Sequence, residues 1–152
     1  MNFEVMNNDD LEEVLRIEKE NFSEPWPRKS FEYDLNNEVA KIVTLKDEGK
    51  LIGYFVVYYM FENADLAKIA VDKKYQGKGY GKRLLKKLIQ NSLEREIEFI
   101  HLEVSVENTR AISMYKAFGF EELRIRKGYY HGTDAIDMMK GLIGLDAKDF
   151  SD

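Results

Sequence analysis

The chain of 152 residues is 44% hydrophobic and 34% charged, with a formal net charge of -5 and no cysteine. This length suits a single domain over residues 1–152 with one core. No apolar run approaches the roughly 20 residues of a membrane span, and the first residues lack the basic and apolar segments of a signal peptide. Disulfides and thiolate metal sites are excluded, so we expect a cytoplasmic protein without membrane contact or bound metal.

The N-terminal part predicts one strand and two helices. A short strand over residues 3–6 precedes a helix over 11–21, whose apolar residues have helical spacing. Both prolines and the only tryptophan lie in the segment 22–27, which ends that helix. A second short helix follows over 28–36. Trp26 is either a hydrophobic plug or one wall of a substrate opening, and the sequence favours neither alternative.

The middle of the chain predicts three strands and a helix. Runs of β-branched and aromatic residues over 41–46 and 51–61, separated by a glycine-containing turn, are typical of a β-hairpin. A further strand is expected over 65–72. Leucine and isoleucine at helical spacing then predict an amphipathic helix over 81–95, with its apolar stripe on the sheet and its N-terminus free.

Gly77, Gly79 and Gly81 lie between the last of these strands and the helix. Glycine lets the backbone approach a ligand closely, and the N–H groups of the first helical turn point toward it. Residues 68–87 contain eight Lys or Arg and one acid, Asp72, which makes a net charge of +7. Cations here oppose the helix dipole, so we expect a bound phosphate. The alternative is a solvated basic face of the helix.

The segment 97–106 alternates in polarity and predicts a strand with one face in the core and the other holding His101 and Glu103. Asn108 is a good N-cap for the helix that follows, and Gly119 stands at its expected C-terminal position.

Two last strands are expected over 120–126 and 135–140, joined by a loop over 128–134 that contains two glycines. From Gly141 the pattern fades, and residues 141–152 are expected to form a C-terminal tail.

The glycine turn reads Gln76-x-x-Gly79-x-Gly81 and follows the fourth strand, which fits neither a Walker loop nor a Rossmann fingerprint. With this element order it resembles the acetyl-CoA pyrophosphate loop of the GCN5-related N-acetyltransferases (GNAT). Further stretches resemble the RimI branch of that superfamily: Phe22-Ser23-Glu24-Pro25-Trp26, Ile69-Ala70-Val71-Asp72, Leu102-Glu103-Val104 with Asn108, Ala111-Ile112-Ser113-Met114-Tyr115-Lys116-Ala117-Phe118-Gly119-Phe120, and Arg126-Lys127-Gly128-Tyr129-Tyr130.

The resemblance implies an α/β (α+β) GNAT fold over 1–152. In this fold a mixed, mostly antiparallel central sheet of about seven strands is flanked by about four helices, and acetyl-CoA lies in the cleft between strands 4 and 5. It also implies acetyl transfer from acetyl-CoA, without a metal, to a protein N-terminal α-amino group. The RimI branch acts notably on the N-terminal alanine of small-subunit ribosomal protein eighteen, so the implied partner is a ribosomal protein.

The resemblance also assigns site residues. Glu103 would be the general base and Tyr115 the general acid. The residues that would bind the cofactor are Ile69, Ala70, Val71, Gln76, Gly77, Lys78, Gly79, Tyr80, Gly81, Lys82 and Asn108. Those that would shape the peptide entrance are Phe22, Trp26, Tyr129 and Tyr130.

Each of these residues could instead have a purely structural role. Glu103 could be a solvent-facing carboxylate, Tyr115 a core aromatic residue and Asn108 a plain N-cap. Many RimI-like chains carry asparagine at the position of Lys68 and arginine at that of Ser105, which leaves the acceptor open. An α-amino group has a pKa of about 8 against about 10.4 for lysine, so a carboxylate base favours N-termini.

Two alternative functions remain. One is acetylation of a small amine or a lysine side chain, and the other is a catalytically silent CoA-binding module. The basic stretch is short and the rest of the chain is acidic, so we expect no direct nucleic-acid binding. We expect a monomer or a weak homodimer.

Overall fold

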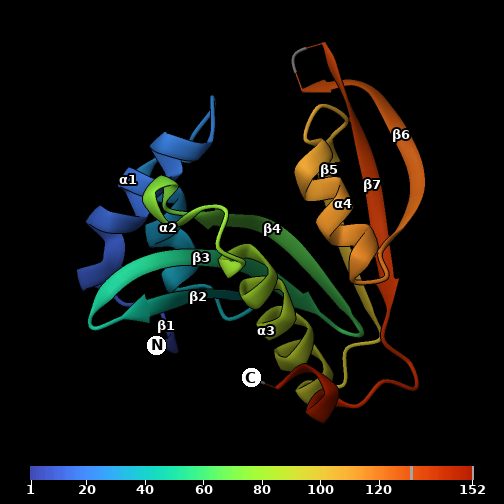
Figure 1. Ribbon diagram of the computed structural model, residues 1–152, viewed down its shortest axis with the longest axis horizontal. Coiled ribbons are helices and arrows are strands. Elements are labelled where there is room, and N and C mark those ends of the chain that lie inside the picture. The colour runs from blue at the N-terminus through green and yellow to red at the C-terminus, as the bar shows by residue number, and fades with distance from the viewer. Residues whose placement is uncertain (131, 152) are drawn as a thin grey trace.

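The structure is a computed structural model that describes residues 1–130 and 132–151, with Tyr130 described by its backbone alone. Its centre is a seven-stranded sheet of order β1-β2-β3-β4-β5-β7-β6 (Figure 1). The strands are β1 (Asn2–Val5), β2 (Ala40–Asp47), β3 (Lys50–Met60), β4 (Asn63–Val71), β5 (Phe99–Ser105), β6 (Glu121–Tyr130) and β7 (Thr133–Gly141). Only the β4–β5 pair is parallel among the described strands. The expected mostly antiparallel sheet of seven strands is confirmed.

The helices lie on both faces of the sheet, as expected for this fold. They are α1 (Leu11–Asn21), α2 (Arg28–Leu35), α3 (Tyr80–Glu94) and α4 (Thr109–Ala117). Short 3-10 turns occur at Asn8–Asp10, Lys73–Tyr75 and Ala147–Phe150. α1 and α2 cover one face of the β1–β4 half, while α3 and α4 pack against the opposite face of the sheet. The sheet therefore separates two hydrophobic cores.

A β-bulge at Ala67 interrupts β4. Val56 and Val57 of β3 lie opposite Lys68 and Leu66, so Ala67 has no partner in β3. Since side chains alternate between faces along a strand, one extra residue reverses the alternation beyond it. Ala64 and Leu66 accordingly belong to the core under α3, whereas Ala70 belongs to the core under α1.

The parallel β4–β5 pairing ends at the same place. It extends only from the Asn63–Phe99 pair to the Leu66–Leu102 pair. β5 nevertheless continues to pair with β7 as far as Ser105. The two halves of the sheet consequently diverge beyond the bulge, toward the top of Figure 1. An opening through the sheet results, bordered by residues 67–71 on one side and residues 103–105 on the other.

The C-terminal region differs from the sequence-based expectation. β6 extends to Tyr130, so most of the expected loop over 128–134 is strand. Gly128 takes a positive φ of 62°, and its N–H donates to Asp134 Oδ1, which ties the long hairpin together across its bend. The tail is ordered as well: the turn Ala147–Phe150 packs on α3. No helix in the described part of the chain is long and apolar enough to cross a membrane.

An ion pair ties α1 to the end of β4. Arg16 Nη2 lies 2.8 Å from Asp72 Oδ2, and Asp72 is 2% exposed. Asp72 Oδ1 also accepts a hydrogen bond from the Lys74 N–H at 3.2 Å, which closes the turn after β4. Burial opposes ionisation of Asp72, but the hydrogen bonds from Arg16 and Lys74 outweigh it and lower the pKa of this carboxyl group below its usual value.

We predict that Asp72→Asn destabilises the fold at neutral pH by about 1–3 kcal/mol, since a hydrogen bond to a charged group is lost. A lowered pKa gives stability that is present above the unfolded-state value of about 3.9 and disappears as the pH falls through the folded-state value. The variant should therefore lose less stability than the wild type between pH 5 and pH 2. Urea unfolding over roughly this range measures the difference. Parallel pH curves for the two proteins would contradict the prediction.

Candidate active site

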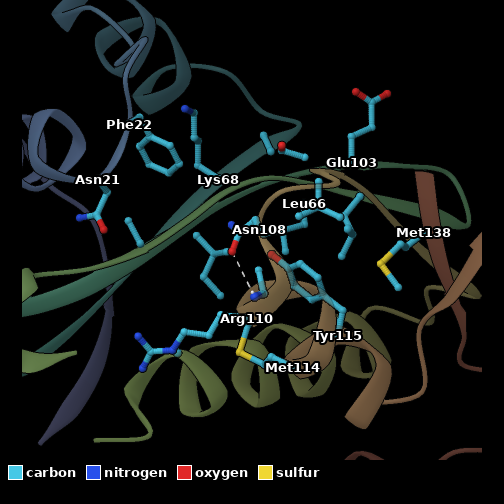
Figure 2. A pocket seen from close by; sticks show the side chains of 18 of the residues that line it. Asn21, Phe22, Leu66, Lys68, Glu103, Asn108, Arg110, Met114, Tyr115 and Met138 are labelled. Atoms are coloured by element: carbon cyan, nitrogen blue, oxygen red, sulfur yellow. Dashed lines mark hydrogen bonds between the residues drawn. The ribbon is translucent and has the colours of Figure 1, made fainter. Parts of the chain in front are cut away.

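A cleft of about 2460 Å³ occupies the opening between β4 and β5. Typical pockets for drug-sized ligands have about 300–1,000 Å³, so this one has room for a long ligand and a second molecule. Its lining comes from β4, the glycine turn, β5, α4 and the segment between α1 and α2. Figure 2 shows side chains from β4, β5, α4 and the segment after α1 around it.

One wall of the cleft is the edge of β4. Over residues 68–71 this strand pairs with β3 on one side, and no described strand pairs with its other side. Ile69, Ala70 and Val71 all line the cleft there. An unpaired strand edge offers backbone N–H and C=O groups to an extended ligand. The arrangement suits an amide-containing chain laid along β4.

The glycine turn closes one end of the cleft. Gly77 and Gly79 have positive φ angles of 79° and 88°, which residues other than glycine rarely adopt. Gly79 is the N-cap of α3 and leaves the first N–H groups of that helix without a side-chain cap. Gln76 is turned toward α1, where its Nε2 donates to Asn21 Oδ1 at 2.8 Å. Of the residues expected at the turn, Lys78 is not in the lining, which contains Gln76, Gly77, Gly79, Tyr80, Gly81 and Lys82.

Arg110 is a residue that the sequence analysis missed. It lies in the first turn of α4 and lines the cleft opposite the glycine turn. A Cβ atom added at Gly77 would have an Arg110 guanidinium nitrogen as its nearest neighbour, at 3.9 Å. A cation at a helix N-terminus is unfavourable unless an anion lies near it, which is the argument that identified the turn. Arg110, two residues after the N-cap Asn108, is such a cation and could have been recognised in the sequence in the same way.

Asn108 caps α4 and also lines the cleft. Its Oδ1 accepts a hydrogen bond from the Ala111 N–H at 3.2 Å, drawn as a dashed line in Figure 2. The amide nitrogen of the same side chain remains available to a ligand, so capping and ligand binding are compatible here.

Glu103 stands at the β5 side of the opening. Leu102 and Val104 lie in the core under α3 and α4, so Glu103 between them faces the opposite side of the sheet. Its Oε1 lies 3.6 Å from Arg126 Nε. The Tyr129 hydroxyl hydrogen-bonds Glu103, and this bond, more than any other cause, raises the pKa of Tyr129. Tyr129 thus lies beside the carboxylate and lines the cleft. The side chain of Tyr130 is outside the described part.

Tyr115 lies on the other side of the sheet. It is 5% exposed, packs against Phe120 with ring centroids 5.7 Å apart, and lines the cleft. In Figure 2 its hydroxyl points toward the opening from below, whereas the Glu103 carboxylate projects away from the upper side. The two side chains therefore border one cleft from opposite faces of the sheet. Tyr115 therefore packs in the core and also lines the cleft.

Phe22 and Trp26 form the wall opposite Glu103, together with Lys68. Trp26 also packs against the buried Phe31, with ring centroids 5.6 Å apart. Trp26 therefore packs on the core and also borders the cleft, and its role in a substrate opening stays a prediction. His101 is engaged structurally, since its Nε2 lies 2.9 Å from Asn63 Oδ1. Within the described residues, no group of three or more His, Cys, Asp or Glu side chains is arranged to hold a metal.

A split sheet with a glycine turn at a helix N-terminus defines the class of protein. The chain belongs to the Acetyltransferase (GNAT) family, whose sequence model matches residues 11–120. The enzymes of this family use acetyl-CoA, and the chain is an acetyltransferase.

The relatives narrow the class further. The [Ribosomal protein bS18]-alanine N-acetyltransferase of Escherichia coli (strain K12) is 34% identical over 82% of this chain and 84% of its own. The protein of the same name from Haemophilus influenzae is 36% identical over 80% of this chain and 82% of its own. The crystal structure of the ribosomal-protein-S18-alanine N-acetyltransferase from Escherichia coli superposes with a TM-score of 0.87 at 32% identity, covering 92% of each chain. The resemblance to the RimI branch is confirmed.

We predict that Gly79→Ala weakens CoA binding about tenfold, because the left-handed turn is strained by a side chain at a cost of roughly 1–2 kcal/mol. Gly144→Ala is the matched control: Gly144 has φ 87° and lies outside the cleft lining, and an added Cβ would meet no neighbouring atom within 4 Å at either glycine. Both variants should unfold at similarly lowered temperatures. Calorimetry should show weaker CoA binding for Gly79→Ala alone, and equal binding by the two variants would contradict a role for the turn.

Proposed function

We propose that this chain transfers the acetyl group of acetyl-CoA to the N-terminal α-amino group of a protein, with the N-terminal alanine of a small-subunit ribosomal protein as acceptor. The observation that carries the proposal is that Glu103 and Tyr115 border one cleft from opposite faces of the sheet. The names of relatives that are 34% and 36% identical over most of the chain support the choice of acceptor. The absence of cysteine favours the cytoplasm as the setting.

The cofactor end of the cleft suits a long anionic thioester. The N–H groups of the first turn of α3, with Lys82 and Arg110, would bind the pyrophosphate. The free edge of β4 over 69–71 would pair with the amide-containing arm, and the Asn108 amide would donate to it. Acetyl-CoA supplies the activated acetyl group and a thiolate leaving group.

The proton transfers fall to two residues of this chain. The acceptor amine must lose a proton before it can attack, and Glu103 would take it directly or through a water. Tyr115, on the other face, would donate its hydroxyl proton to the departing sulfur. One group removes a proton where the acceptor enters and the other supplies one where the thiol leaves. This separation prevents the two groups from neutralising each other.

The environment of Glu103 supports its role as a base. Neighbouring Arg126 is engaged mainly by Asp137, at 3.0 Å against 3.6 Å for Glu103. The carboxylate therefore has a cation nearby without a short ion pair. Tyr129 and Arg126 would hold it in place.

A panel of acceptors tests the function. We expect acetylation of a peptide with a free N-terminal alanine, at its N-terminus as located by mass spectrometry, and none of the same peptide with a blocked N-terminus and an internal lysine. Faster acetylation of polyamines or of the internal lysine would support the alternative acceptor class. CoA binding by calorimetry without turnover of any amine would support the silent module.

We predict that Glu103→Gln lowers kcat for the alanine peptide by about 10²–10⁴-fold, the usual contribution of a general base. Its Kd for acetyl-CoA should not change, because the carboxylate faces the acceptor side. The loss should shrink at high pH, where more of the amine, with a pKa of about 8, is already neutral. Glu107→Gln is the control, since Glu107 is an exposed carboxylate that also lines the cleft. Equal rates for the two variants would remove Glu103 from the role of base.

A further inference from the structure

We propose that Lys68 occupies an ammonium-binding cage in the acceptor wall and thereby excludes acceptors whose first side chain is cationic. The cage consists of Glu18, Phe22 and Trp26. The exclusion rests on the proposed function, because it concerns the acceptor of that reaction. The cage itself does not, since it is defined by contacts within the wall.

The Lys68 ammonium group is enclosed by one carboxylate and two aromatic rings. Its Nζ lies 3.0 Å from Glu18 Oε2, 3.7 Å from the centroid of the Phe22 ring and 5.2 Å from that of Trp26. The Lys68 side chain is only 13% exposed. Aromatic faces combined with a carboxylate are the arrangement that proteins use to bind alkylammonium ligands. Here the bound ammonium belongs to the chain itself.

Glu18 is held in place independently of Lys68. It is completely buried, its Oε2 accepts the Trp26 N–H at 2.8 Å, and its Oε1 accepts the Tyr54 hydroxyl. Loss of Lys68 would leave these hydrogen bonds but remove the counter-ion of a buried carboxylate. A buried charge without a counter-ion is costly, so the empty cage would attract another cation.

The cage lies beside the reacting groups. Lys68 follows the bulge directly, and this position turns it toward α1 rather than into the core under α3. In Figure 2 Lys68 and Glu103 project to the same side of the sheet from opposite edges of the opening. An acceptor whose amine reaches Glu103 therefore has its first side chain near the wall formed by Phe22, Trp26 and Lys68. A neutral side chain meets ring faces there, whereas a cationic one meets a cage already filled by a cation.

Propylammonium is the matching probe, because Lys68→Ala removes three carbon atoms and an ammonium group, and this ion contains the same number of each. We expect saturable binding of propylammonium to Lys68→Ala in calorimetry, about tenfold tighter than to the wild type, and no such gain for propan-1-ol. The measurement needs neither acetyl-CoA nor an acceptor. A failure of the proposed acetylation would therefore leave the result readable. A folded Lys68→Ala that does not prefer propylammonium would overturn the cage.

Lys46→Ala is the matched control. Lys46 has a side chain 11% exposed and pairs with Asp10, 9% exposed, at 2.7 Å, but no cation–ring contact among the described residues involves it. Propylammonium should bind this variant no better than the wild type. Equal gains for the two variants would mean that an unpaired carboxylate suffices and that the rings form no cage.

Specificity gives the second readout. The ratio of kcat/KM for an alanine peptide to that for a peptide beginning with lysine should fall about tenfold from the wild type to Lys68→Ala. An unchanged ratio would overturn the exclusion. If Lys68→Ala does not fold alone, we expect propylammonium, and not propan-1-ol, to restore its thermal transition in a saturable manner. Failure to restore it would count against the cage.

Discussion

The parallel pairing of β4 with β5 ends after four residue pairs, and the rest of the site depends on that limit. The bulge at Ala67 adds one residue to β4 at the same place, so the strand bends away while β5 stays with β7. A continuous sheet would satisfy every backbone group internally and would separate its two faces completely. The interrupted sheet leaves a strand edge for a ligand and gives two faces access to one cleft.

Two ion pairs, each with a buried carboxylate, connect α1 to this opening. Arg16 reaches the turn after β4 through Asp72, and Glu18, two residues further along the helix, reaches the strand itself through Lys68. Desolvated charges must be paired, so each contact specifies one position of α1 against β4. The first pair lies beside the turn that leads to the glycines, and the second lies at the wall of Phe22 and Trp26. One helix thereby holds β4 at two points beside the opening, which explains how a cleft that crosses the sheet can keep its geometry.

The two faces of the sheet differ in polarity around the cleft. The face under α3 and α4 is largely apolar and holds Tyr115, and the cations Lys82 and Arg110 line the cleft from the first turns of the two helices. On the opposite face Glu103 is exposed, whereas Asp137 is buried beneath ion pairs with Arg124 and Arg126 of β6. The two substrates of the proposed reaction also differ in polarity. A CoA thioester is a long ligand with an anionic end, whereas a protein acceptor presents a cationic amine on a large body.

Features that depend on residues close in the chain could be read from the sequence. These include the helix and strand periodicities, the glycine turn, the Asn108 cap and the alternation that points Glu103 away from the core, because each follows from backbone conformation over a few residues. The number of strands and their mostly antiparallel arrangement were predicted from the resemblance to the GNAT family. The bulge at Ala67, the approach of Arg110 to the glycine turn and the cage around Lys68 could not be read in this way. Each depends on which distant strand or helix lies opposite, and a single inserted residue in β4 reverses the face that every following side chain occupies.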